Sequence, residues 1–334
     1  MTSTLGHPPF DPELIPALTE AHEEAPVTLT PENLAECRQA ELDATLTLEF
    51  LAEGGIELEE RLVPGPAGAP DISLLIARPP GRNGPLPGLL HTHGGGFVMG
   101  NNRTGLDAMI GWVTNPGLVI VSVEYRLAPE HRYPAGTEDC YAGLAWTAAH
   151  AEELGIDPQR LIVGGGSAGG GLAAACSLMA RDRGGPALAG QMLIYPMLDD
   201  RFVTGSSQEL DGDGIWDRPS NEAAWTMLLG DQRGQDGVSE YAAPARATDL
   251  SGLPPAYIEL GSVETFRDED LEYARRIWAA GGSAELHVWP GGYHAFELIA
   301  PDSTLAASAL QVRLNWLRRT LGGATGQPEP PVPG

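Results

Sequence analysis

Short β-rich segments alternate with helical patterns along most of the chain, and this alternation restricts the possible folds more than any other feature. Strands are expected at 56–63, 71–79, 87–93, 117–125, 160–165, 190–196, 255–261 and 284–290. The first two alternate in polarity and are joined by a Gly- and Pro-rich turn, which predicts an antiparallel pair at a sheet edge. Most of the later runs are continuously apolar, which is typical of parallel strands buried on both faces. The pattern therefore predicts an α/β fold, with helices on both faces of a mostly parallel sheet.

Helical patterns fill the intervals between the later strands. They occupy 138–154, 168–182, 268–281 and 303–321. Two more precede the first strand, at 11–25 and 30–53, and the second opens with Thr30 as an N-cap and Pro31 as the first helical residue. Residues 198–250 interrupt the alternation with Asp, Gly, Ser and Trp, and this segment is too long for an ordinary connection. An inserted helical element or lid is expected there.

Composition excludes several classes of function. At 334 residues and 42% hydrophobic, the chain can bury the core of one large domain with an accessory element. The net charge of −25 argues against nucleic acid as a partner, because binding it requires a basic surface. All basic residues are Arg, with no Lys. This excludes a Walker phosphate loop, a Schiff-base enzyme and a Ser-x-x-Lys nucleophile.

The cysteines and the N-terminus bear on the compartment. Cys37, Cys140 and Cys176 are odd in number and widely spaced, which argues against a disulfide framework or a zinc cluster. The first residues show no basic and apolar regions of a secretory signal. No apolar run approaches the roughly 18 residues of a membrane span. A cytoplasmic protein without a membrane span is expected.

The stretch "GGGSAGGG", Gly164 to Gly171, fits two motifs at once. It matches the dinucleotide spacing G-x-G-x-x-G and the hydrolase spacing G-x-S-x-G around Ser167. The dinucleotide interpretation requires an acid at the end of the next strand for the ribose hydroxyl. Asp182 has about the required spacing of ~20 residues, but it lies at the end of a helical pattern. Its context therefore argues against a nucleotide-dependent oxidoreductase.

The hydrolase interpretation requires an imidazole to take the serine proton and an acid to orient that imidazole. In α/β-hydrolases the chain order is serine, acid and histidine. Ser167 follows one predicted strand, acids follow a later one in "GSVETFRDED", and His294 follows the last. The three residue types therefore occur in the required order.

The negative charge that forms on the substrate needs backbone N–H donors. The N–H of Ala168, at the start of the helix after Ser167, is one candidate. The glycine loop "HTHGGGF" follows an earlier strand, and its side-chain-free backbone lets the N–H groups of Gly94 and Gly95 approach that charge. These three groups are the predicted oxyanion hole.

Taken together, these motifs resemble the hormone-sensitive-lipase branch of the α/β-hydrolases, the bacterial carboxylesterases with an H-G-G-G motif. The resemblance runs from about residue 86 to 300 and rests on "HGGGFVMG", "EYRLAPEHRYPAG", "GGSAGG", "YPMLDDR", "YAAPARATDLSGLPPAYIELG", "RDEDLEYA" and "YHAF". It implies Ser167 as nucleophile, His294 as general base and acid, and Glu264 as the acid aligned with the triad. It also implies that no metal or organic cofactor is needed.

The resemblance also implies a domain plan in which a cap covers the acyl pocket. The expected parts are cap helices at 1–52, the α/β-hydrolase core at 53–197 and 251–322, a cap insertion at 198–250 and a disordered tail at 323–334. A closed pocket implies short- to medium-chain esters as substrates. A homodimer through the last strand and helix is a further expectation from resemblance.

Three positions depart from the family pattern. Glu264 stands where the family usually has Asp, which keeps the carboxylate on a longer stem, and Asp268 is the alternative acid. Gly166 replaces the Asp that usually precedes the nucleophile, so a charge is missing there. Ala295 replaces the Gly that usually follows the histidine, and this change is expected to be tolerated.

Several other residues admit more than one interpretation. Phe97, Met99, Trp216 and Trp225 could line the acyl pocket, and the two Trp could equally be core aromatics of a small cap. The pair His91 and His93 lacks the further ligands of a metal site. We expect His93 to shape the glycine loop and His91 to be a strand residue.

Charged residues near the strands are expected to form structural contacts. Arg126 is predicted to pair with acids such as Asp139, because charges inside a fold are normally paired. Asp199 and Asp200 are expected to make strand-end or cap contacts.

The predicted function is that of a serine carboxylesterase acting through an acyl-enzyme, with amide hydrolysis as a weaker possibility. The main alternative is a binding protein for small molecules on the same fold. Such a protein would lack a triad member, and His294 is present.

Overall fold

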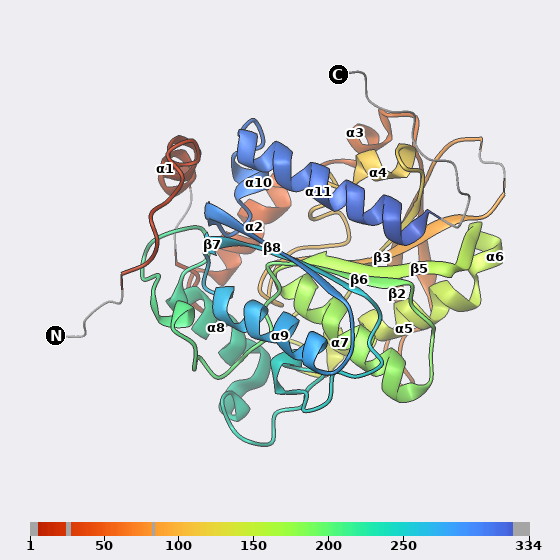
Figure 1. Ribbon diagram of the computed structural model, residues 1–334. Helices are drawn as coiled ribbons and strands as arrows, with labels where there is room; N and C mark the ends of the chain where they lie inside the picture. The colour runs from red at the N-terminus through yellow and green to blue at the C-terminus, as the bar shows by residue number, and fades with distance from the viewer. Residues whose placement is uncertain (1–5, 25–27, 82–83, 323–334) are drawn as a thin grey trace.

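The computed structural model describes residues 6–24, 28–81 and 84–322 (Figure 1). Its strands form one eight-stranded sheet in the order β1-β2-β4-β3-β5-β6-β7-β8. Their bounds are β1 Glu57–Val63, β2 Ile72–Arg78, β3 Leu86–Thr92, β4 Val119–Glu124, β5 Ile156–Gly166, β6 Gly190–Ile194, β7 Ala256–Val263 and β8 Ala284–Tyr293. Each predicted strand is present, so the predicted sheet is confirmed.

Pairing directions follow the sequence patterns. β2 pairs antiparallel with both β1 and β4, and β1 forms one edge of the sheet. From β4 through β3 to β8, neighbouring strands pair in parallel. All of β6 is buried, as expected for a continuously apolar strand covered on both faces.

Helices cover both faces of the sheet, with α11 on one face and α5, α7 and α9 on the other (Figure 1). The bounds are α4 Ile110–Thr114, α5 Ala135–Ala149, α6 Ala151–Leu154, α7 Ala168–Arg183, α9 Arg267–Ala279, α10 Phe296–Ile299 and α11 Thr304–Leu321. Ser303 caps the start of α11, because its side chain accepts a hydrogen bond from the N–H of Ala306. Across the described ranges, no helix combines the length and apolar character needed to cross a membrane.

The N-terminal segment contains three short helices: α1 Ile15–Glu24, α2 Leu34–Ala44 and α3 Leu48–Ala52. The single helix predicted from 30 to 53 is wrong, because Thr47 accepts from the N–H of Phe50 and starts a new helix. Pro31 is not helical either. Thr30 and Asn33 exchange side-chain to backbone hydrogen bonds, and the helix begins only after this closed turn.

Residues 198–250 contain the helical elements η1 Ser206–Gln208, α8 Arg218–Leu229, η2 Gly230–Gln232 and η3 Pro244–Arg246. The N-terminal segment binds directly to the start of α8. The Thr28 hydroxyl donates to Asp217 at 2.6 Å, and the N–H of Leu29 donates to the Ser220 hydroxyl at 2.8 Å. The two segments are therefore in direct contact. The predicted disordered tail, 323–334, lies outside the described residues.

Candidate active site

Ser167 occupies a sharp turn between β5 and α7. Its φ of 58° and ψ of −125° lie in a region that residues other than glycine rarely adopt. Its N–H donates to the Ile194 carbonyl at 2.9 Å. Its own carbonyl accepts from the N–H groups of Gly171 and Met197, both at 3.0 Å. The surrounding backbone thus holds the serine in a strained conformation typical of a nucleophile elbow.

The glycines beside Ser167 permit close packing against the end of β3. A Cβ on Gly165 would lie 2.2 Å from the Thr92 carbonyl oxygen, and one on Gly169 would lie 2.0 Å from it. The Thr92 hydroxyl also donates to the Gly169 carbonyl at 2.7 Å. The glycine run therefore serves the turn and its packing.

Glu264 and His294 meet at the carboxyl ends of β7 and β8. The His294 Nδ1 lies 2.8 Å from Glu264 Oε2, and the carboxylate side chain is fully buried. Asp268 points elsewhere: its Oδ2 accepts from the N–H of Ser206 at 2.9 Å, and its Oδ1 accepts from Arg267. Of the two acids considered, the geometry favours Glu264.

Aromatic rings surround the His294 imidazole. The ring centroids of Tyr195, Phe266 and Trp216 lie 4.7, 5.5 and 6.3 Å from its own. Tyr195 also links the histidine to the elbow, since a Cβ on Gly166 would lie 3.3 Å from its ring. The Tyr195 ring thus lies beside Gly166, but this contact does not explain the replacement of the usual Asp by glycine.

Ser167 and His294 are 7% and 6% exposed, so both lie beneath covering segments. Their side chains, both described, make no hydrogen bond to each other. Catalytic hydrogen bonds are often long or misaligned before substrate binds.

The glycine loop after β3 lies against the elbow. A Cβ on Gly94 would lie 3.7 Å from that of Ser167, and Gly95 has a φ of 100° with the Met99 carbonyl 2.2 Å from where its Cβ would be. Among the described residues, the N–H groups of Gly94, Gly95 and Ala168 donate to no protein acceptor. These free donors beside Ser167 form an arrangement that can bind an oxyanion.

His93 supports this loop. Its ring stacks on Tyr125 at 4.0 Å, and its Nδ1 lies 2.8 Å from the Gly94 carbonyl oxygen. Burial lowers the pKa of His93 to about 4, so the ring is neutral and Nδ1–H is the donor. The prediction that His93 shapes the loop is confirmed.

Burial lowers the pKa of His91 to about 3, and its Nδ1 lies 2.8 Å from the Ser122 hydroxyl on β4. It is a strand residue, as predicted. In the part of the chain that the structure describes, no three His, Cys, Asp or Glu side chains converge on a metal position.

His91→Gln is expected to make stability less sensitive to acid. The unfolded histidine titrates near pH 6.5 and the folded one near 3, so the unfolded state binds the extra proton as the pH falls between these values. At pH 5 this costs the native protein about 2 kcal/mol, and glutamine cannot bind that proton. Urea unfolding at pH 7 and pH 5 measures the difference. An equal loss of unfolding free energy in both proteins would contradict the expectation.

The four candidate pocket residues do not share one environment. The rings of Phe97 and Trp225 pack at 5.3 Å, and Trp225 is fully buried in the core. Trp216 covers the glycine loop, since a Cβ on Gly96 would lie 2.6 Å from its ring. Met99 instead lines a groove that includes Arg38 and Tyr125. Trp216 is the one nearest the imidazole.

Arg38 on α2 was not recognised from the sequence. Its guanidinium donates to the carbonyls of Val98 at 2.6 Å and Ala128 at 2.8 Å, and it makes two hydrogen bonds to Glu130. These hydrogen bonds lower the pKa of Glu130 to about 2. The N-terminal segment is thereby fixed to the backbone just after the glycine loop.

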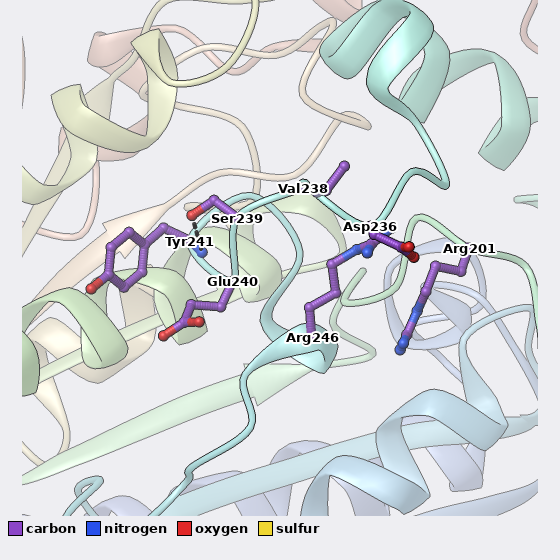
Figure 2. A pocket seen from close by; sticks show the side chains of 7 residues that line it. All are labelled: Arg201, Asp236, Val238, Ser239, Glu240, Tyr241 and Arg246. Carbon is purple, nitrogen blue, oxygen red and sulfur yellow. Dashed lines mark hydrogen bonds between the residues drawn. The ribbon is translucent and has the colours of Figure 1, made fainter.

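A second, polar pocket lies away from Ser167, and Figure 2 shows the side chains that line it. Its Arg201 and Arg246 are paired with Asp199 and Asp200 at 2.7 and 2.6 Å. The two acids thus make ion pairs after β6. Both arginines of this pocket therefore already have a carboxylate partner.

Arg126 and Asp139 form the predicted buried contact. Arg126 Nε and Nη2 donate to the two Asp139 oxygens at 2.8 Å each, and the N–H of Arg126 adds a third hydrogen bond at 3.0 Å. The carboxylate is fully buried. The pair fixes the loop after β4.

A strained serine between β5 and α7, an acid after β7 and a histidine after β8 define the architecture of an α/β-hydrolase. Residues 89–298 match a family described as having the alpha/beta hydrolase fold. Carboxylesterase NlhH of Mycobacterium tuberculosis is 38% identical over 317 residues, which cover 93% of this chain and 97% of that protein. Esterase LipI of the same organism is 36% identical over 252 residues, covering 74% of this chain and 78% of that protein.

Solved structures agree with these relatives. A bacterial heroin esterase has a TM-score of 0.86 and 42% sequence identity, covering 93% of this chain and 98% of that chain. Esterase LipW from Mycobacterium marinum has a TM-score of 0.83 and 32% identity, covering 94% of this chain and 98% of that chain. The chain belongs to the hormone-sensitive-lipase-like bacterial carboxylesterases of the α/β-hydrolase superfamily, as predicted.

Proposed function

We propose that this carboxylic ester hydrolase uses Ser167, His294 and Glu264 as its triad, with Gly94, Gly95 and Ala168 as the oxyanion hole. The observation that carries the proposal is the 2.8 Å contact between His294 Nδ1 and buried Glu264, beside a serine held at positive φ. The Glu264 carboxylate is within hydrogen-bonding distance of Nδ1, although its side chain is one methylene longer than that of the Asp usual in the family. The acid fixes the tautomer that leaves Nε2 free to accept the serine proton.

The reaction follows from these positions. The Ser167 oxygen attacks the ester carbonyl carbon while His294 takes the hydroxyl proton, and the carbonyl π electrons move to the oxygen. The free N–H groups bind that oxyanion, each contributing about 2.7 to 4 kcal/mol by analogy with measured oxyanion holes. Collapse expels the alcohol, which receives the proton from His294. Water then attacks the acyl-enzyme by the same route and releases the acid.

We further propose that residues 1–52 and 198–250 form a cap over the site, leaving 53–197 and 251–322 as the core. The hydrogen bonds from Thr28 and Leu29 to the start of α8 support a joint cap. Trp216, which contacts the glycine loop, narrows the space beside His294. Short- to medium-chain esters are therefore the proposed substrates.

A fluorophosphonate is expected to add one phosphonyl group per chain, on Ser167. The reagent requires an activated serine, and a serine that serves only as a helix cap does not react. Intact-mass measurement followed by peptide mapping identifies the residue. A protein that stays unlabelled would instead support the alternative of a binding protein on this fold. Turnover of nitrophenyl esters of increasing acyl length then measures the proposed size limit.

A homodimer through β8 and α11 also remains a proposal. β8 is an edge strand, and Val288 on it and the neighbouring Trp278 are 40% and 46% exposed. Sedimentation at low concentration distinguishes a dimer from a monomer.

A further inference from the structure

A buried ion cluster lies behind the His294 loop and has no part in the reaction described above. Arg313 on α11 is 3% exposed and makes ion pairs with Glu259 on β7 and Glu297 on α10. The Tyr195 hydroxyl donates to Glu297 Oε1 at 2.8 Å, and the Tyr257 hydroxyl donates to Glu259. One guanidinium, two carboxylates and two phenols thus form one connected network.

Such a cluster is costly to bury. Moving ions out of water carries a free-energy penalty that their pairing only partly offsets. Burial accordingly raises the pKa of Glu259, and the charge of Arg313 opposes this effect. A buried network of this kind contributes little to the stability of the fold. Its position relative to His294 therefore suggests a functional role.

Tyr195 connects the network to the catalytic residues. It follows β6 with a φ of 36°, and its N–H donates to the Glu259 carbonyl at 2.6 Å. Its ring lies 4.7 Å from the His294 ring and beside Gly166. Its hydroxyl is bound to Glu297, three residues after His294. The network therefore holds both the ring that packs on the imidazole and the helix that follows the imidazole.

We propose that Tyr195, fixed by Glu297 and Arg313, is a positioning residue that aligns the His294 imidazole between Glu264 and Ser167. Its electron-rich ring also stabilises the imidazolium that exists while His294 carries the serine proton. Tyr195 acts through His294 and not on the substrate, so its effect belongs to the chemical steps. The inference rests on the proposed triad.

Tyr195→Phe keeps the ring and removes the hydroxyl that anchors it. We expect kcat for a nitrophenyl ester to fall about tenfold with KM within about twofold, because misalignment of a general base affects chemistry more than binding. Glu297→Gln keeps an acceptor for the phenol and is expected to retain more activity than Glu297→Leu. The double variant Tyr195→Phe with Glu297→Gln should lose less than the product of the single losses, since both act through one contact.

Tyr257→Phe is the matched control. It also removes a buried hydroxyl bound to this network, but its ring lies 5.5 Å from His287 and 5.6 Å from Trp316. It is expected to lower the thermal midpoint as Tyr195→Phe does, while kcat falls far less than in Tyr195→Phe. An unchanged kcat in Tyr195→Phe, or an equal fall in both variants, would overturn the positioning role.

Failure of the underlying triad gives a different result. If a chain with Ser167→Ala turned over the ester as fast as the wild type, the proposed function would fail whatever the Tyr195 variants do. If that substitution abolishes turnover and Tyr195→Phe has no effect, only the positioning role is rejected.

Discussion

Ser167→Ala is expected to lower kcat for a nitrophenyl ester by at least about 10⁴-fold, because no other group can form the acyl-enzyme. The free N–H groups of the glycine loop remain, so a small residual rate above the uncatalysed reaction is expected. The thermal midpoint should change little, since the Ser167 hydroxyl makes no hydrogen bond with the described residues. Steady-state kinetics with purified protein measures the effect.

Ser177→Ala is a suitable control for this substitution. Ser177 is buried in α7, the helix that follows Ser167, and its hydroxyl donates to the Ala173 carbonyl at 3.0 Å. It removes a buried serine hydroxyl without touching the elbow, so activity should persist. Undiminished turnover in Ser167→Ala would exclude the mechanism.

Glu264→Gln is expected to lower kcat on the order of 10³- to 10⁴-fold. The glutamine amide can present a donor to Nδ1, which favours the tautomer with a proton on Nε2 and blocks acceptance of the serine proton. It also removes the charge that stabilises the imidazolium. KM should change much less, because the carboxylate is buried behind the imidazole and binds no substrate.

Asp268→Asn is the comparison for the acid. Asp268 binds the N–H of Ser206 and the Arg267 side chain, so its loss should affect the attachment of the inserted segment and cost less than tenfold in kcat. Parallel kinetics of the two variants decides between the acids. The reverse order of activities would assign the role to Asp268.

The sequence was sufficient to predict the sheet because its signals are local. A continuous apolar run, such as that of β6, reflects a strand buried on both faces. The alternating pattern of β1 and β2 reflects strands with one buried face. The site was predicted from the order of Ser167, an acid and His294 after three strands of the predicted parallel sheet, because parallel strands bring their carboxyl ends to one edge. The position of Glu264 beside His294 agrees with that interpretation.

Contacts between distant segments were not predictable. Tyr195 lies in a motif noted in the sequence, yet nothing local indicates that its ring meets His294 and its hydroxyl meets Glu297, which is 102 residues away. The contact between Gly166 and the Tyr195 ring is likewise not indicated by any local pattern. The break between α2 and α3 is not evident from the sequence, because the helical pattern continues through Thr47, which caps α3 in the structure.

The hydrogen bond from Arg38 to the Val98 carbonyl makes the N-terminal segment relevant to the active site. One guanidinium on α2 binds the Val98 carbonyl, 60 residues further along the chain, just after the glycine loop that carries the proposed oxyanion donors. Truncating the protein to its sheet and flanking helices would remove the Arg38 contact to that loop together with the proposed cap. We therefore expect that an active version of this enzyme has to begin before α2, because the loop of the proposed oxyanion hole is held by this contact.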